Sequence, residues 1–314
     1  MLTVFRATLS PMLVMLICIL AGFILRKCRI LPDNSDRVLS RLETYILMPA
    51  LNIRTFMQNA SLSSLAEHSN LLLICSGVVV VAILIAYALA GRMAKEPYQK
   101  NLYRYSLTIS NFGFMGNAIV PMILGEDMLY PYLLFTLPPI VCIYTWGMAM
   151  LIPADATDKK SAWRRLLNPG TVSVLIGLLL GVVGAQQYTP PFIQTTLGNL
   201  SDCMGPVAMV LTGFVIGSYP LKSLFNKPAV YVASLLRLII LPALFVGALL
   251  LLNAPDTAVV LCLFAFGTPL GLNTIVFPAA YGGDTAPGAA MAMVSHAMCI
   301  LTIPLMYALL TALM

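Results

Sequence analysis

The segment Gly116-Asn117-Ala118-Ile119-Val120-Pro121 has a near copy later in the chain, Asn273-Thr274-Ile275-Val276-Phe277-Pro278. Both copies keep the order Asn, any residue, Ile, Val and then Pro, and Phe277 is a single inserted residue. The two asparagines are 156 residues apart (273 − 117), about half of the 314-residue chain. Each copy lies in a long apolar stretch that Gly and Pro interrupt. The pattern indicates an internal repeat with matched breaks in its two halves.

The composition identifies an integral membrane protein. Hydrophobic residues make up 60% of the chain and charged residues only 10%, whereas soluble domains have roughly 25% charged residues. The basic residues fall in short clusters between apolar runs, which excludes a nucleic-acid-binding surface. We find no phosphate-binding loop, metal-ligand cluster or nucleophile constellation in the sequence, so we expect neither an enzyme nor a bound cofactor or metal.

Ten apolar segments are long enough to cross a bilayer, which takes about 20 residues per helix. The fold class is therefore an all-α polytopic membrane protein. The first repeat, 1–152, and the second, 170–314, flank a polar linker at 153–169. The ten predicted spans are 8–26, 37–58, 70–91, 101–124, 128–152, 170–187, 196–218, 228–252, 257–280 and 287–312.

Lysine and arginine orient these spans. Four clusters hold most of the 18 basic residues, and they follow spans 1, 3, 5 and 7. The positive-inside rule places those loops in the cytoplasm and both termini outside. We therefore expect a multi-pass protein of a bacterial cytoplasmic membrane.

A shift of 156 residues corresponds to five spans. Because five is odd, the second half enters the membrane upside down, and the halves are predicted to be inverted repeats. Pro49 of span 2 and Pro206 of span 7 support this register, since 206 − 49 is 157. Span 4 then corresponds to span 9.

Broken helices in these two spans predict a binding site. Unwound backbone survives in a membrane only where protein or water satisfies it. We expect the breaks to cross near the membrane centre and to expose half-helix N-termini, whose N–H groups attract an anion. The alternative is plain proline kinking. The predicted crossover residues are Asn111, Gly113, Gly116, Asn117, Pro121, Thr268, Pro269, Gly271, Asn273 and Pro278.

Four ionisable residues inside spans are candidates for charge or proton coupling, because a charge at mid-membrane costs on the order of 2.5–3.5 kcal/mol. Arg237 could raise the positive potential near an anion, or extend to the cytoplasmic face or pair with an acid. His296 would suit a proton-linked step, although it could also be a hydrogen-bonded packing residue. Glu43 and Asp202 lie towards the ends of their spans, which favours a solvated or structural role.

The chain resembles the auxin efflux carrier family, which includes bacterial malate and malonate permeases and the plant PIN auxin exporters. The resemblance rests on the end of span 2, Leu47-Met48-Pro49-Ala50-Leu51, on the run Ser110-Asn111-Phe112-Gly113-Phe114-Met115-Gly116-Asn117 and its span 9 copy, and on the arrangement of five plus five spans. It covers essentially the whole chain.

The resemblance implies a scaffold of spans 1, 2, 6 and 7 and a transport domain of spans 3–5 and 8–10. It further implies elevator-like alternating access and a homodimer built on the scaffold. The crossover prolines and asparagine of the family map onto Pro121, Pro278 and Asn117, and Asn273 follows from the internal repeat. The distantly similar bile-acid symporters bind sodium through an acidic side chain around span 9. A sodium site of that type is not expected here, because the segment from Ala265 to Tyr281 contains no carboxylate.

We therefore expect a secondary transporter that binds a small organic anion, a carboxylate, at the crossover. We expect membrane lipid to surround the protein. A membrane sensor that binds a ligand without moving it and an anion channel are the alternatives. Coupling to protons stays open.

Overall fold

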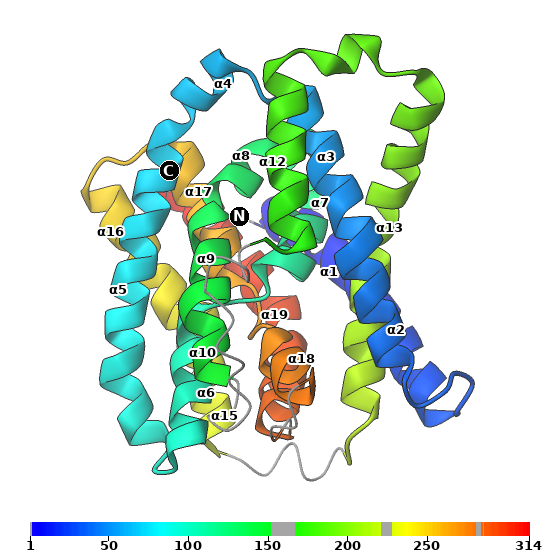
Figure 1. The fold of residues 1–314 in the computed structure, drawn as a ribbon. Helices are drawn as coiled ribbons and strands as arrows, with labels where there is room; N and C mark the ends of the chain where they lie inside the picture. Colours follow the sequence, from blue (N-terminus) through cyan, green and yellow to red (C-terminus); the bar gives the residue numbers. More distant parts are fainter. Residues whose placement is uncertain (1, 152–166, 221–227, 281–283, 285) are drawn as a thin grey trace.

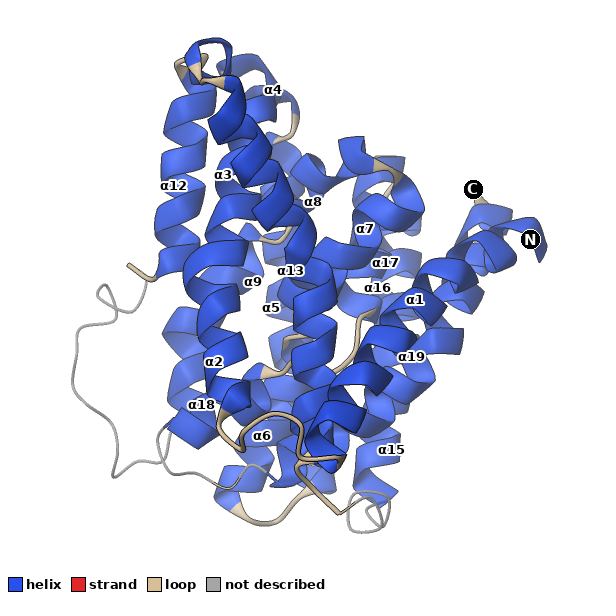
Figure 2. Ribbon diagram, turned by 90° about the vertical axis from the view of Figure 1, so that its right-hand side faces the viewer, coloured by secondary structure: helices blue, strands red, loops and turns tan. Residues whose placement is uncertain are grey.

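The computed structural model describes residues 2–151, 167–220, 228–280, 284 and 286–314, and these residues are almost entirely helical (Figures 1 and 2). Each of the ten predicted spans contains helix within the described part of the chain, but several of them are broken or short. The charged residues of the predicted linker and the basic residues Lys222 and Lys227 lie outside the described residues.

Within the described residues, five continuous helices are both long and apolar enough to cross a membrane. Four of them are single α-helices, and the fifth contains the π-helical turn η7. Their bounds are Leu2–Lys27 (α1), Ser69–Met93 (α5), Pro191–Gly217 (α13), Pro228–Leu251 (α15, η7 and α16 together) and Ala286–Leu313 (α19). The apolar length of these helices establishes a polytopic membrane protein.

The remaining predicted spans are shorter, more polar or broken. The second is a continuous helix made of α2 (Ser35–Leu42), a π-helical turn η1 (Glu43–Leu47) and α3 (Met48–Asn59), and α12 (Pro169–Val182) is the sixth. The fifth bends by 44° between Glu126–Phe135 and Leu137–Gly147. Pro138 and Pro139 at this bend lack the N–H groups that would continue the helix. Its pieces are η3 (Glu126–Met128), α8 (Leu129–Phe135), α9 (Leu137–Cys142), η4 (Ile143–Gly147) and α10 (Met148–Leu151).

The fourth and ninth predicted spans are each interrupted. The fourth consists of α6 (Pro97–Thr108), a π-helical turn η2 (Phe112–Gly116) and α7 (Asn117–Leu124). The ninth consists of α17 (Asp256–Gly267) and α18 (Asn273–Ala280). The short elements α4 (Leu62–Glu67) and η6 (Ala185–Tyr188) connect longer helices, and α15 (Pro228–Leu235), η7 (Leu236–Ile240) and α16 (Leu241–Leu251) complete the eighth span.

Glycines allow two pairs of helices to pack at backbone distance. On α13, a side chain at Gly213 would overlap the carbonyl oxygen of Ile19 on α1. On α12, a side chain at Gly181 would overlap the carbonyl oxygen of Phe56 on α3. Small residues permit such close approach between membrane helices. The small-residue spacing of Gly177 and Gly181 therefore serves packing within the chain.

The two ends of the molecule differ in what they carry. The turns between α1 and α2 and between α5 and α6 lie at the lower end in Figure 1, and both carry basic residues. Both views place the two termini close to each other and away from these turns. The basic segments that the structure describes therefore gather at one end.

Candidate functional site: the crossing of two interrupted helices

The first interruption lies between Thr108 and Phe112. Ile109 is extended, with φ −110° and ψ 125°, and the chain becomes helical again at Phe112. The N–H of Asn111 donates to the carbonyl oxygen of Pro269 in the second interruption at 2.7 Å. Ser110 and Leu270 form an antiparallel bridge at the same point. The two unwound segments are therefore hydrogen-bonded to each other.

The second interruption lies between Gly267 and Asn273, and its polar backbone groups are also satisfied by neighbouring elements. The Ser110 hydroxyl donates to the carbonyl oxygen of Ala265 at 2.5 Å, close to the C-terminal end of α17. The N–H of Leu270 donates to the Ser295 hydroxyl on α19 at 3.1 Å. These bonds meet the requirement that unwound backbone within a membrane be hydrogen-bonded by protein.

The prolines of the repeated motif do not cause the interruptions. Pro121 lies inside α7 and Pro278 inside α18, each after the break in its span. The breaks instead include Asn111 in the first span and Thr268, Pro269 and Gly271 in the second, all of them predicted crossover residues. Gly113 lies just after the first break, and Pro269 and Gly271 lie within the second one. Asn273 is the first residue of α18, whereas η2 and α7 form one helix that begins at Phe112, so Asn117 lies in the second turn of the first half-helix.

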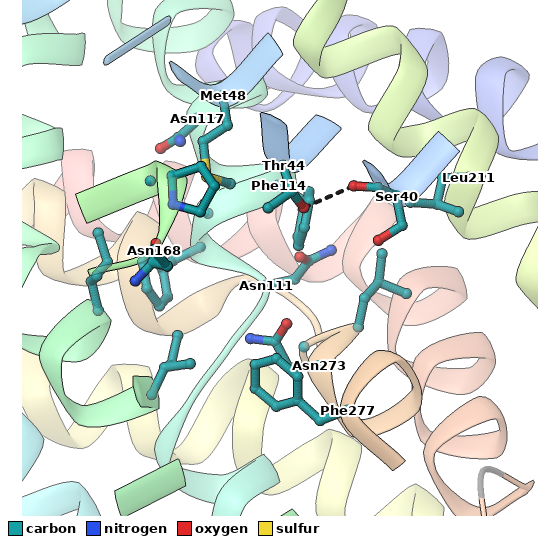
Figure 3. A pocket seen from close by; sticks show the side chains of 18 of the residues that line it. Ser40, Thr44, Met48, Asn111, Phe114, Asn117, Asn168, Leu211, Asn273 and Phe277 are labelled. Atoms are coloured by element: carbon teal, nitrogen blue, oxygen red, sulfur yellow. Dashed lines mark hydrogen bonds between the residues drawn. The ribbon is translucent and has the colours of Figure 1, made fainter. Parts of the chain in front are cut away.

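A cavity of about 590 Å³ reaches the crossing (Figure 3). It is lined by the break and half-helix of the first interruption, from Ser110 to Asn117, and by Gly271–Phe277 of the second. One face of α2 and α3 and the start of α12 form the opposite wall, and α8–η4 closes the side. Since the first N–H groups of a helix have no intrahelical partner, both half-helix starts direct donors towards this region.

Half of the predicted crossover residues border the cavity. Asn111, Gly113, Asn117, Gly271 and Asn273 line it. The other five are not among the lining residues; they are Gly116, Pro121, Thr268, Pro269 and Pro278. Gly116 instead lies against the hydroxyl of Tyr132, so that a side chain at this position would overlap it. These five residues shape the backbone around the site.

The three asparagines of the crossing, Asn111, Asn117 and Asn273, have different hydrogen bonds. The Asn111 side chain is buried and its Nδ2 lies 3.1 Å from Nε2 of His296. Asn273 Nδ2 donates to the hydroxyl of Tyr105 at 2.9 Å. Within the described part of the chain, the Oδ1 atoms of Asn111 and Asn117 are buried and have no hydrogen-bond partner. Because such groups are costly to leave unpaired, both oxygens are available to accept a hydrogen bond from a donor group.

Arg237 is fully buried and binds the end of α6. Its Nη1 donates to the carbonyl oxygen of Leu107 at 3.0 Å and lies 3.5 Å from that of Thr108. Its guanidinium carbon lies 5.4 Å from the centre of the Phe266 ring. The last carbonyls of a helix lack intrahelical partners and carry partial negative charge. Arg237 therefore stabilises the C-terminal end of α6 and neither reaches the membrane surface nor pairs with Asp202 or Glu43.

The two acidic candidates lie in different surroundings. The Asp202 carboxylate is exposed and accepts from Nη1 of Arg54 at 2.9 Å. Glu43 is completely buried in the π-helical turn η1, and neither of its carboxyl oxygens has a hydrogen-bond partner among the described residues. A solvated role for Glu43 is therefore wrong. The turn it occupies packs against α13 and α12.

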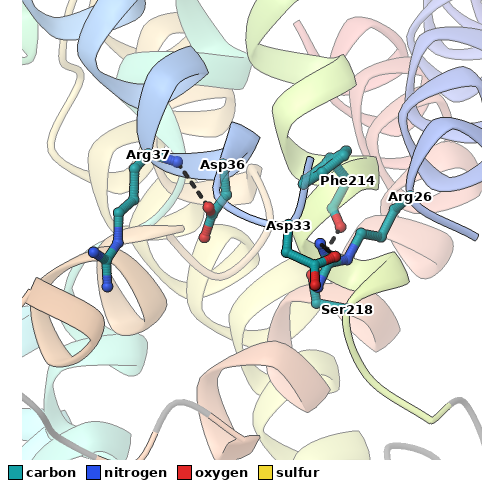
Figure 4. Close-up of polar contacts among 6 residues, drawn as sticks. All are labelled: Arg26, Asp33, Asp36, Arg37, Phe214 and Ser218. Atoms are coloured by element: carbon teal, nitrogen blue, oxygen red, sulfur yellow. Dashed lines mark hydrogen bonds and ion pairs between the residues drawn. The ribbon is translucent and has the colours of Figure 1, made fainter. Parts of the chain in front are cut away.

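Charged side chains occur only at the mouth of the cavity, among its lining residues. They are Asp36, Arg37 and Arg41, on the first two turns of α2. Asp36 accepts a hydrogen bond from the backbone N–H of Arg37 at 2.8 Å, and a separate ion pair joins Arg26 to Asp33 at 2.6 Å nearby (Figure 4). The two arginines leave a positive excess at the mouth, which favours the approach of anions.

The wall formed by α2 and α3 was not predicted from the sequence. Ser40, Thr44, Met48 and Asn52 recur every four residues and all line the cavity. Their spacing places them on one helix face, and this polar stripe in the least apolar span is the signal that could have revealed them. Asn52 is held there by a hydrogen bond from its Nδ2 to the Ser173 hydroxyl on α12 at 2.9 Å.

The chain is similar to known families and relatives of membrane transporters. The model of a family described as membrane transport protein matches residues 7–307. The chain is 24% identical over 280 residues to an uncharacterized transporter of Methanocaldococcus jannaschii, covering 88% of this chain and 90% of the relative. It is 23% identical over 247 residues to an uncharacterized transporter of Methanothermobacter thermautotrophicus, covering 78% and 79% of the two chains.

Proposed function

We propose that this chain, which belongs to the membrane transport protein family of the auxin efflux carriers, is a secondary transporter that carries a small organic anion with a carboxylate group. The observation that carries the proposal is the crossing itself. Two interrupted helices are hydrogen-bonded at Asn111 and Pro269, and the half-helices that follow border one cavity. Helix starts and amide side chains bind anions without a permanent countercharge, which permits both capture and release.

The proposed architecture is ten spans in two inverted repeats. Such a relation exchanges span 1 with 6 and span 2 with 7, so the contact of α1 with α13 and that of α3 with α12 become equivalent. Both contacts occur and both use glycine at the interface. The same relation pairs the contact of α5 with α6 and that of α16 with α17, which also both occur.

In this proposal the scaffold consists of α1, α2–α3, α12 and α13, and the remaining spans form the domain that moves. The cavity supports this division because it lies between them. Asn52 and Gly170 of the scaffold line one wall, and Asn111 and Asn273 of the crossing line the other. An elevator-like motion would carry the crossing, with its bound anion, along the wall formed by α2, α3 and α13.

The conformation fits a state open to the cytoplasm. The cavity mouth is lined by Arg37 and Arg41, which the positive-inside rule assigns to the cytoplasmic side. Beyond the cavity, an apolar cluster joins α3 to α8, and the Ser64 and Tyr130 hydroxyls lie 3.0 Å apart. That cluster contains Leu47, Leu51, Phe56, Ala60, Leu129, Tyr130, Leu133, Leu134, Val174 and Met204.

A pair of repeat-related interfaces supports the same state. The inverted repeat makes the interface of spans 1 and 10 equivalent to that of spans 6 and 5. The first is packed, since α1 contacts α19. At the second, residues of α9 and of the start of α12 line the cavity from opposite sides, among them Ile140 and Gly170. One closed and one open interface is the arrangement expected of an alternating-access transporter.

Proteoliposome transport tests the proposal. The purified wild type should accumulate labelled malate or phenylacetate, and unlabelled anion inside the vesicles should accelerate entry. The double variant Asn117→Ala/Asn273→Ala should lose uptake while remaining folded by size-exclusion chromatography. Binding without exchange would instead identify a sensor, and flux without acceleration by internal anion would identify a channel. Equal uptake by the double variant and the wild type would refute the site.

The proposed transporter assembles as a homodimer through the scaffold, as the family resemblance implies. The exposed apolar faces of α1 and α12 leave room for such contacts and for lipid; the exposed side chains include Leu13, Ile17, Leu175 and Leu179. Mass measurement of the protein in detergent or nanodiscs distinguishes a dimer from a monomer.

A further inference from the structure

Two adjacent residues of α19 hold the two interruptions together. The Ser295 hydroxyl accepts from the N–H of Leu270 at 3.1 Å, and the neighbouring His296 contacts the Asn111 amide at 3.1 Å. Ser295 therefore contacts the second break and His296 the first. Both side chains are buried. Any change in the hydrogen bonding of His296 is thus transmitted directly to a residue that lines the cavity.

The hydrogen bonds of His296 define its tautomer. Its Nδ1 lies 2.7 Å from the carbonyl oxygen of Ala292, which can only accept, so Nδ1 carries the proton. In the neutral ring Nε2 is then an acceptor, and the group that faces it must be the Nδ2 donor of Asn111. This arrangement leaves Asn111 Oδ1 buried and without a partner in the described structure.

We propose that His296 is a proton-binding site whose protonation rotates the Asn111 amide and so couples a proton to the anion at the crossing. A protonated ring has N–H groups at both nitrogens. Its Nε2–H would oppose the Asn111 N–H donors but would suit the Oδ1 atom that now has no partner. Rotation of the amide pairs Oδ1 with Nε2–H and turns the two Nδ2–H donors towards the position that Oδ1 leaves.

Burial makes this protonation depend on the anion. A charged group within a membrane protein is costly without a countercharge, and the rotated Asn111 amide would have unpaired donors. A carboxylate at the crossing supplies both the negative charge and the acceptors. Anion and proton therefore stabilise each other's binding, and the effect is reciprocal by linkage. The inference rests on the proposed carboxylate function and specifies its coupling ion.

The neighbouring titratable groups leave the imidazole without an ion pair among the described residues. Cys299 on the same helix donates its Sγ–H to the carbonyl oxygen of His296 at 3.0 Å. The elements packed against α19 include α1, α13, α15, η7, α17 and α18, and α6 and η2 contact it through Ser106 and Met115. None of the titratable residues of these elements, nor Tyr307 of α19, forms a hydrogen bond or ion pair with His296 in this structure; they are Arg6, Cys18, Arg26, Lys27, Tyr98, Lys100, Tyr103, Arg104, Tyr105, Asp202, Cys203, Tyr231, Arg237, Asp256 and Cys262.

Proton uptake on anion binding tests the inference in the wild-type protein. The detergent-solubilised full chain is mixed with malate or phenylacetate in weakly buffered solution containing a pH indicator, between about pH 6 and pH 8. We expect about one proton taken up per anion bound and an affinity that rises by up to about tenfold for each unit fall in pH. Binding with no proton uptake and no pH dependence would overturn the inference while leaving the carboxylate function intact.

Two histidine variants assign the proton. His296→Gln keeps a hydrogen-bonding side chain but cannot take up the proton. Anion binding to this variant should therefore neither take up nor release a proton, and its affinity should not depend on pH. His68→Gln is the matched control, because His68 is the other histidine of the chain and caps α5 away from the cavity. It should behave as the wild type. Wild-type proton uptake by His296→Gln would overturn the assignment.

A second variant and the wild-type binding result separate folding from function. If His296→Gln does not elute as a folded species in size-exclusion chromatography, His296→Asn is used in its place. If the wild type binds neither malate nor phenylacetate, the carboxylate function fails, and the inference that depends on it fails with it. The wild-type proton count decides the inference on its own.

Discussion

The two interruptions at the crossing carry the same motif but are supported by different chemistry. At the first, the buried cation of Arg237 binds the end of α6 and His296 binds Asn111. At the second, the supporting groups are neutral hydroxyls: Ser110 donates to a carbonyl near the end of α17, and Tyr105 accepts from Asn273, which is the repeat counterpart of Asn117. The repeat thus extends to the backbone and the asparagines, whereas the side chains that support them are particular to each half.

This difference separates the roles of the two breaks. The second break is held by bonds between neutral groups and has no titratable partner at Asn273 other than a tyrosine. The first contains the arginine and the histidine, and its Asn111 and Asn117 each keep an oxygen without a partner in the described structure. We therefore expect the first half-helix to respond to ligand and proton, and the second to provide a fixed counterpart. Four predictions test this comparison.

The largest effects are expected at the repeated asparagines. Asn117→Ala and Asn273→Ala should each weaken anion uptake by about tenfold to a hundredfold, since a hydrogen bond to a charged group contributes about 1.5–3 kcal/mol. Only Asn273→Ala should also lower thermal stability, because only Asn273 bonds to Tyr105. Uptake assays with thermal unfolding measure both effects, and exposed Asn59→Ala is the control. Equal losses of thermal stability in the two variants would contradict the proposed difference in how the two asparagines are supported.

Glycine substitutions probe how closely each half-helix is packed. A side chain at Gly288 would overlap the carbonyl oxygen of Thr274 in α18, whereas the space around Gly113 in η2 is open. Gly288→Ala should therefore destabilise the protein by about 1–3 kcal/mol, and Gly113→Ala should change stability by less than about 0.5 kcal/mol. Thermal or denaturant unfolding measures the difference. If Gly288→Ala leaves the stability unchanged, α18 is not packed tightly against α19.

Removal of one hydroxyl tests the support of the second asparagine alone. Tyr105→Phe removes the partner of Asn273 and should cost about 1 kcal/mol of stability. The effect should vanish in an Asn273→Ala background, because the bond is already lost there. The exposed Tyr188→Phe serves as the control. Full additivity of the two substitutions would show that the bond contributes nothing.

The smallest effect is expected at the mouth. Arg37→Gln/Arg41→Gln should slow the entry of anions from the cytoplasmic side a few-fold at low ionic strength, and salt should abolish the difference. Both breaks lie behind this mouth, so the variant should affect neither the proton count nor stability. Initial rates in vesicles of defined orientation measure the effect, with Arg92→Gln as control. A salt-independent loss would place the arginines in the binding site.

Sequence reasoning reached the helices and the meeting of the two breaks because apolar length and the repeated motif are local signals. Some span limits agree closely with the observed helices, as for 70–91 and Ser69–Met93, whereas 8–26, 170–187 and 196–218 differ from Leu2–Lys27, Pro169–Val182 and Pro191–Gly217 by five or six residues at one end. The breaks lie at the N-terminal part of the two predicted segments, since the first ends at Asn111 and the second contains Thr268, Pro269 and Gly271. Pro121 and Pro278 lie in the half-helices and not at the crossing.

The supporting contacts could not be predicted because they join residues far apart in sequence. Nothing near Arg237 indicates that its partners are the carbonyls of Leu107 and Thr108, 129–130 residues away. The burial of Glu43 depends likewise on α13 and α12. Periodicity reports which face of a helix is polar, but the element that covers that face is decided by tertiary packing.

The most direct test of the crossing as the anion site is an electron cryo-microscopy structure of the full chain with bound malate or phenylacetate. We expect a carboxylate within hydrogen-bonding distance of Asn117 or Asn111 on one side and of the backbone or side chains of Gly271–Asn273 on the other. A carboxylate bound only at Arg37 and Arg41, with the crossing unoccupied, would contradict it.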